Sequence, residues 1–131
     1  MPRSRELGPE EEPEIGGDEP AQLALRIERE LDLLARNVEI LEKLSKSPPL
    51  GIIRLSEALH LPIHKTRYSL HLLEREGVVQ PSADGAVVTD RVSEFWATMN
   101  QSLDRMAAEL DRLKARASVH GARSASGRKG Y

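Results

Sequence analysis

Residues 63–76 gather basic and hydrogen-bonding side chains whose spacing suits contact with DNA. Thr66, Leu70 and Leu73 recur at the spacing of one buried helix face, so the residues between them are expected on the exposed face. This exposed set consists of His64, Lys65, Arg67, Tyr68 and His71. Base edges in the major groove are read by an exposed helix face that carries donors and acceptors. We therefore predict that this helix binds DNA, and a purely solvated polar face is the alternative.

The side chains of this helix suit different parts of DNA. Arg67 carries a planar guanidinium that can pair with guanine, whereas Lys65 is equally suited to a phosphate. Tyr68 and His71 suit either contact. His64 stands near the helix start, where we expect a contact with the DNA backbone together with free helix amides.

The segments on either side are expected to hold this helix in a small, mainly helical domain. Ser47-Pro48-Pro49 ends the preceding helical stretch because proline cannot continue the hydrogen-bond ladder, and Gly77 is a suitable stop after the DNA-binding helix. The expected elements are one long helix or two over residues 21–46, an extended piece over 50–52, helices over 53–60 and 63–76 separated by Leu61-Pro62, and a hairpin over 78–88 with Asp84-Gly85 at its turn. In the helix over 53–60, we expect Leu55, Ala58 and Leu59 to face inward. Arg54 at its start is a candidate phosphate contact, with a solvated charge as the alternative.

A heptad stripe follows Thr89, which is suited to cap the last helix. Its members alternate spacings of four and three residues, which is typical of helices that associate. They are Val92, Trp96, Met99, Leu103, Met106, Leu110, Leu113 and Ala117, and all but Ala117 are predicted dimer contacts. Glu109 and Lys114 could pair between parallel helices, but the other flanking residues are uncharged, so an antiparallel or mixed bundle stays open. The stripe that runs from Ile27 to Leu41 either belongs wholly to the core or projects its first turns toward a partner helix.

Composition limits the classes of protein to consider. The chain has 131 residues, no cysteine and no apolar run long enough to cross a bilayer, so we expect a cytoplasmic protein without disulfides or thiolate metal sites. Net charge is −2, but the acidic excess lies in residues 1–20 and a basic excess lies toward the C-terminus. We expect residues 1–20 to be a disordered acidic tail, residues 21–92 the N-terminal helix and DNA-binding domain, residues 90–117 a dimerisation helix, and residues 118–131 a disordered basic tail.

Several motifs together resemble the winged helix-turn-helix superfamily, on the branch of small archaeal and prokaryotic regulators similar to the MarR, ArsR and PadR families. The similar segments are LSEAL at 55–59, HKTRYSLHLLEREGVV at 64–79, and Asp84-Gly85 followed by Val87-Val88-Thr89. The resemblance implies a mainly α fold with a small β-hairpin, the wing, and long terminal helices that form a dimerisation coiled coil or bundle. It also implies a homodimer that binds double-stranded DNA sequence-specifically and regulates transcription.

Alternative functions belong to other classes. A wing tip without lysine or arginine and a nearly neutral central domain favour a protein-interaction module, and a third interpretation is an architectural protein that binds DNA without sequence preference. We expect no enzyme, because no nucleophile with its base, phosphate loop or carboxylate pair is evident. We expect no cofactor and no metal site, and the sequence leaves open whether a small-molecule effector exists.

Overall fold

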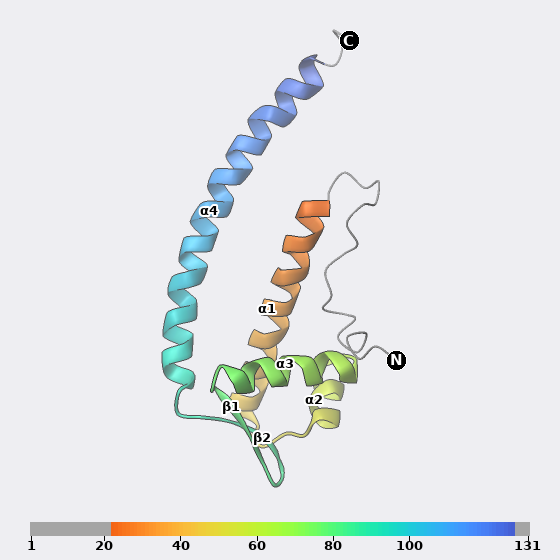
Figure 1. The fold of residues 1–131 in the computed structure, drawn as a ribbon, viewed down its shortest axis with the longest axis vertical. Helices are drawn as coiled ribbons and strands as arrows, with labels where there is room; N and C mark the ends of the chain where they lie inside the picture. The colour runs from red at the N-terminus through yellow and green to blue at the C-terminus, as the bar shows by residue number, and fades with distance from the viewer. Residues whose placement is uncertain (1–21, 128–131) are drawn as a thin grey trace. The chain divides into compact units, whose positions relative to one another are not determined.

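The computed structural model describes residues 22–127, with side chains up to residue 122. The predicted acidic tail over residues 1–20 and the last four residues of the predicted basic tail lie outside the described residues. The described chain is mainly helical, with one antiparallel hairpin and a long C-terminal helix, as predicted (Figure 1). It divides after Val92 into two compact units, and each is described by itself.

Helix α1 spans Gln22–Lys46 as one uninterrupted helix, which decides between the one-helix and two-helix predictions. Lys43 and Lys46 lie in its last turn, where positive charge is favourable beside the helix C-terminus. The predicted stop at Ser47-Pro48-Pro49 is confirmed. Only the C-terminal half of α1 is packed into the core, through Ile40, Leu41 and Leu44, whose side chains have no solvent exposure.

Helices α2 (Ile52–Leu59) and α3 (Ile63–Arg75) are joined by the tight turn that Leu61-Pro62 predicted. His60 adopts the left-handed conformation with φ 57°, and the amide of Leu61 donates to the carbonyl of Ser56 at 2.9 Å. Gly77, with φ 82°, follows the end of α3, as expected of a residue that adopts this conformation at little cost. α3 contacts both α1 and α2 in this unit.

The hairpin pairs β1 (Val79–Ser82) with β2 (Gly85–Val88). Ser82 lies opposite Gly85, so the two turn residues are Ala83 and Asp84, and the predicted Asp84-Gly85 turn is wrong by one residue. The reason is that Gly85 is needed inside the strand. The backbone of Leu50 crosses there and exchanges two hydrogen bonds with Ala86, of 3.1 and 2.8 Å. The extended piece predicted over residues 50–52 is thus confirmed at Leu50 and Gly51, whereas Ile52 already belongs to α2.

The core of this unit is small and aliphatic. It consists of Ile40, Leu41, Leu44, Leu55, Leu70, Leu73, Val78, Val79 and Ala86. Leu55 is buried as predicted and Leu59 is partly buried, but Ala58 is exposed, which corrects the expected inward set of α2. Ser56 takes the buried position instead, because its hydroxyl finds a hydrogen-bond partner on α3.

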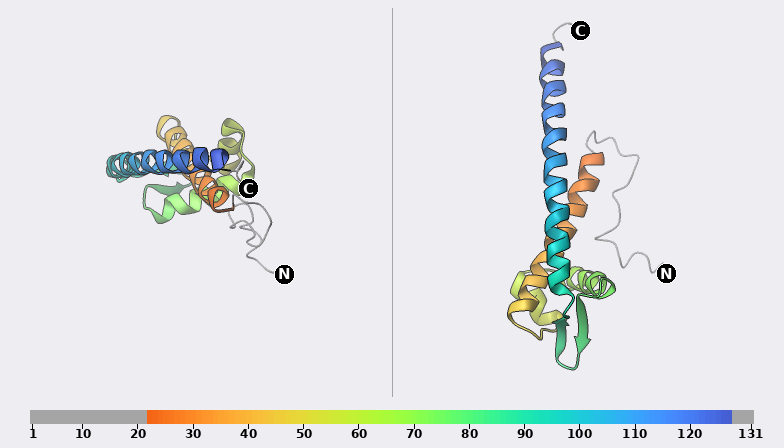
Figure 2. Two further views of the ribbon diagram at one scale, coloured as in Figure 1. Left: turned by 90° about the horizontal axis from the view of Figure 1, so that it is seen from above. Right: turned by 90° about the vertical axis from the view of Figure 1, so that its left-hand side faces the viewer.

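The long helix α4 spans Val92–Gly127 and is drawn as one continuous helix in Figure 2, and from Ser93 onward it forms the described part of the second unit. It continues well beyond Ala117, so the predicted disorder over residues 118–127 is wrong. This segment is small and polar, but it contains no proline to interrupt the backbone ladder. Among the described helices, none combines the length and hydropathy needed to span a membrane.

Thr89 lies three residues before Val92, the first residue of α4, and its carbonyl accepts a hydrogen bond of 3.2 Å from the amide of Val92. Its hydroxyl donates to the carbonyl of Gly77 at 2.6 Å and accepts a bond of 3.3 Å from the amide of Arg91. It therefore ties the end of the hairpin back to the glycine that follows α3.

Candidate nucleic-acid interface

The inner face of α3 is fixed by apolar contacts and by paired polar groups. Thr66, Leu70 and Leu73 are buried, which confirms the predicted stripe, and Ser69 is fully buried beside them. The hydroxyl of Thr66 donates to the carbonyl of Pro62 at 3.3 Å and accepts a hydrogen bond of 2.8 Å from the hydroxyl of Ser56. Because these polar groups are satisfied, α3 can bury a mixed face without a large desolvation cost.

A second buried hydrogen bond joins α3 to α1. Arg36 is only 7% exposed, and its Nε donates to Oγ of Ser69 at 2.8 Å. A charged side chain in the core is unfavourable unless hydrogen bonds compensate for the lost water. The orientation of α3 against α1 therefore depends on a charged contact as well as on aliphatic packing.

The outer face of α3 presents hydrogen-bonding side chains, although not all members of the predicted set equally. His64, Arg67 and His71 are exposed, whereas Lys65 and Tyr68 are half-buried. Arg75, outside the predicted set, is also exposed and lies one helical turn beyond His71. The exposed face is therefore centred on His64, Tyr68, His71 and Arg75.

Lys65 and Arg67 lie on opposite edges of this face. At roughly 100° per residue, their side chains leave the helix axis roughly 160° apart. Lys65 is on the edge next to buried Ser69, whereas Arg67 is on the edge nearer the hairpin. The two cations therefore cannot enter one groove at the same depth.

A hollow of about 200 Å³ lies between α3, the hairpin and the Leu50 bridge. Arg67 and His71 line it from α3, and Ser82 and Gly85 line it from the hairpin. His71 faces Glu74 at 3.8 Å, an exposed pair whose contribution to stability is small. The positive charge beside the hairpin thus comes from α3, since residues 79–88 contain no lysine or arginine.

The structure supports a DNA contact at Arg54 but does not group the histidines into a metal site within the described residues. Arg54 is exposed in the first turn of α2, as a phosphate contact requires. His60 occupies the turn and is exposed, away from the helical spacing of His64 and His71. Within residues 22–127, no three histidine or acidic side chains are grouped so that they could hold a metal ion.

Helix α4 carries the predicted apolar stripe on an exposed surface. Val92, Trp96 and Met99 are half-buried, and the rings of Phe95 and Trp96 lie edge to face at a centroid distance of 5.7 Å. Exposure then rises along the stripe, from 39% at Leu103 to 52% at Leu113. Large apolar side chains at a heptad spacing are rarely left in water, so this stripe is a candidate surface for helix association.

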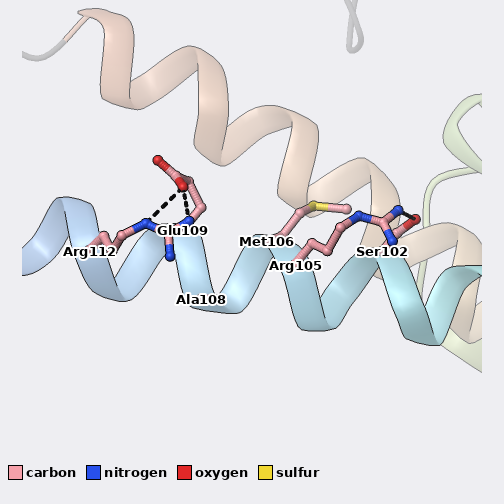
Figure 3. A pocket seen from close by; sticks show the side chains of 6 residues that line it. All are labelled: Ser102, Arg105, Met106, Ala108, Glu109 and Arg112. Carbon is pink, nitrogen blue, oxygen red and sulfur yellow. Dashed lines mark hydrogen bonds and ion pairs between the residues drawn. The ribbon is translucent and has the colours of Figure 1, made fainter.

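The polar side chains of α4 form contacts within the helix (Figure 3). Glu109, which could pair with Lys114 between parallel helices, forms an ion pair with Arg112 one turn away on its own helix. Arg105 likewise donates to the hydroxyl of Ser102 at 3.1 Å. The carboxylate of Glu109 therefore has a partner on its own helix, which weakens the case for parallel pairing.

The N-terminal half of α1 carries a further exposed apolar stripe. Leu23, Ile27 and Leu31 are 71%, 51% and 44% exposed, whereas Leu34 and Val38 are half-buried and Leu41 is buried. The prediction that the whole α1 stripe belongs to the core is therefore wrong for these first turns within the first unit.

Four residues were missed by reasoning from the sequence. Arg75 is not in the exposed set that the sequence analysis names, although its spacing from His71 places it on the outer face. Ser69 completes the Thr66, Leu70 and Leu73 pattern, which is a signal that was present in the sequence. Arg36 and Ser56 gave no such signal, because polar side chains are assigned to the surface unless a buried partner is known.

A scan of the sequence against protein-family models and a search of curated proteins each returned no match. Function must therefore be inferred from the residues and their geometry.

Proposed function

We propose that this protein is a homodimeric, sequence-specific DNA-binding regulator of transcription, with a winged helix-turn-helix domain. Helix α3 enters the major groove, and the hairpin β1–β2 acts as the wing. The observation that carries the proposal is the two-sided character of α3. Its inner face is fixed to α1 and α2 by paired polar groups, and its outer face presents His64, Arg67 and Arg75 to solvent.

The connection between α2 and α3 supports this function. A recognition helix must be held rigidly and must expose its N-terminal residues, since those contact base edges. The turn at His60 and Leu61 is fixed by backbone bonds, and α3 begins immediately after Pro62. His64 and Arg67 are therefore displayed from the end of the helix that a major groove would receive.

Electrostatics favour a dimer over a single bound copy. Residues 50–92 carry Arg54, Lys65, Arg67, Arg75 and Arg91, balanced by Glu57, Glu74, Glu76, Asp84 and Asp90. Phosphate attraction from one nearly neutral domain is weak, whereas two linked domains gain affinity through effective concentration. The exposed stripes of α4 and of the first turns of α1 supply surfaces for the pairing.

Selection from a random duplex library tests the proposal. We expect a two-part motif, and an affinity that falls steeply with salt because cations displace counterions from phosphates. Arg67→Ala should change the selected bases or reduce affinity about 10-fold or more. Lys65→Ala should weaken binding uniformly across sequences, since its half-buried edge position suits a phosphate.

The matched control is Arg29→Ala, which removes an exposed arginine from the first half of α1. Its affinity and motif should equal those of the wild type. If Arg67→Ala also leaves both unchanged in a folded dimer, the assignment of α3 as the reading helix is wrong.

A protein-interaction module is the second candidate, favoured by the hairpin without basic residues. No measurable duplex affinity at low salt, with the dimer intact, would support it. Salt-dependent binding without any selected motif would instead support an architectural DNA-binding role.

A further inference from the structure

The buried contact between Arg36 and Ser69 connects two parts of the molecule with different proposed tasks. Arg36 lies on α1 between the exposed apolar turns at Leu23, Ile27 and Leu31 and the buried turns at Ile40 and Leu41. Ser69 lies on the inner face of α3, and its neighbours in the sequence are the half-buried Tyr68 and the buried Leu70. The contact thus joins the helix that extends out of the core to the helix that faces DNA.

The chemistry of this contact makes it sensitive to orientation. Aliphatic side chains tolerate small sliding and rotation, whereas a hydrogen bond weakens steeply as its angle departs from linearity. Here the donor Nε and acceptor Oγ are 2.8 Å apart, and both residues are buried. Rotation of α3 against α1 would leave a buried guanidinium with a poorer set of partners, which is a strongly unfavourable state.

We propose that Arg36 is a positioning residue that sets the angle between α3 and α1 and thereby the spacing of the two DNA half-sites that the dimer accepts. This inference rests on the proposed function, because half-site spacing has meaning only for a dimer that binds DNA. Each added base pair shifts a half-site by about 3.4 Å and rotates it by about 35°. A dimer with a fixed α3 angle therefore discriminates between neighbouring spacings, and a dimer with a loose angle does not.

The test uses duplexes that carry two copies of the selected half-site, separated by a series of spacers that differ by one base pair. A duplex with a single half-site reports the chemistry of α3 alone. We expect the wild type to prefer its best spacer over the adjacent ones by about 10-fold. In Arg36→Met, which keeps an unbranched chain of similar length, that preference should fall below about threefold, with single-site affinity unchanged within about twofold.

The angle itself is measured without DNA. The chain has no cysteine, so cysteines placed at the exposed Glu39 of α1 and Arg75 of α3 can carry spin labels. Labelled chains are diluted with unlabelled ones, so that only distances within one chain are recorded. Arg36→Met should widen the distance distribution, whereas Arg29→Met, at an exposed arginine on the same helix, should leave both readouts at wild-type values.

Each outcome decides the inference. An unchanged spacer preference in folded Arg36→Met overturns it, even if the distance distribution widens, because the role is then purely structural. If Arg36→Met does not fold, Ser69→Ala removes only the acceptor, and an unchanged distribution there overturns the inference. If the wild type selects no motif, the proposed function fails, while the spin-label distances still decide whether Arg36 fixes α3.

Discussion

Substituting Gly85 with alanine should destabilise the hairpin far more than the same substitution at Gly51, although the two glycines lie on crossing segments. Gly85 has φ 133°, which side-chain-bearing residues rarely adopt. A Cβ there would also stand 2.5 Å from the carbonyl carbon of Leu50 and 2.7 Å from the amide nitrogen of Gly51. These are backbone atoms held by the bonds between Leu50 and Ala86, so they cannot move aside without breaking the bridge.

Two effects add to the loss of stability of Gly85→Ala: backbone strain and displacement of packed atoms. Backbone strain in a sparsely populated region costs about 1–3 kcal/mol, and forced displacement of packed atoms costs about 1–3 kcal/mol more. We therefore expect Gly85→Ala to lose about 2–6 kcal/mol of the free energy of unfolding. Gly51 has φ −80°, and no atom lies within 4 Å of the place that a Cβ would occupy, so Gly51→Ala should stay within about 0.5 kcal/mol of the wild type.

Gly77→Ala should lose an amount of the free energy of unfolding between the losses of Gly51→Ala and Gly85→Ala. Its φ of 82° is left-handed, but the nearest atom to a Cβ is the end of the Arg91 side chain, at 2.7 Å, and that side chain can move. We expect a loss of about 1–2 kcal/mol. Urea unfolding followed by far-UV circular dichroism, at equal protein concentrations because a dimer unfolds in a concentration-dependent way, gives the ranking. Equal stability of Gly85→Ala and Gly51→Ala would refute the steric role of the Leu50 crossing.

Two further predictions concern the polar core and the long helix. Thr66→Val should cost about 1–3 kcal/mol, because it leaves the buried hydroxyl of Ser56 without its acceptor. The double variant with Ser56→Ala should be less destabilised than the sum of the single variants, and strict additivity in urea unfolding would contradict the hydrogen bond. Leu110→Glu places a charge in the exposed α4 stripe and should convert the proposed dimer to monomer in sedimentation equilibrium, whereas Asp111→Glu, beside it on the same helix and exposed, should not. A monomeric wild type, or a dimeric Leu110→Glu, would show that the stripe serves another purpose.

Local sequence patterns determined the elements and much of their amphipathic character. Helical spacing marked Thr66, Leu70 and Leu73 as the inner face of α3, and prolines and Gly77 marked the ends of helices. These signals are reliable because periodicity and backbone restriction act over a few residues and need no knowledge of the rest of the chain. The same reasoning fails at residues 118–127, where small polar composition suggested disorder although nothing in it stops a helix.

Tertiary structure alone decided which polar residues are buried and which element lies beside each cation of α3. Arg36 and Ser69 are 33 residues apart, and their hydrogen bond exists only because α1 and α3 pack together. Helical spacing alone places Lys65 and Arg67 on opposite edges of α3, but only the packed structure shows that Arg67 lies beside the hairpin. The physical reason is that burial and hydrogen bonding depend on the partner across the interface, and a sequence pattern specifies the face of a helix without specifying what covers it.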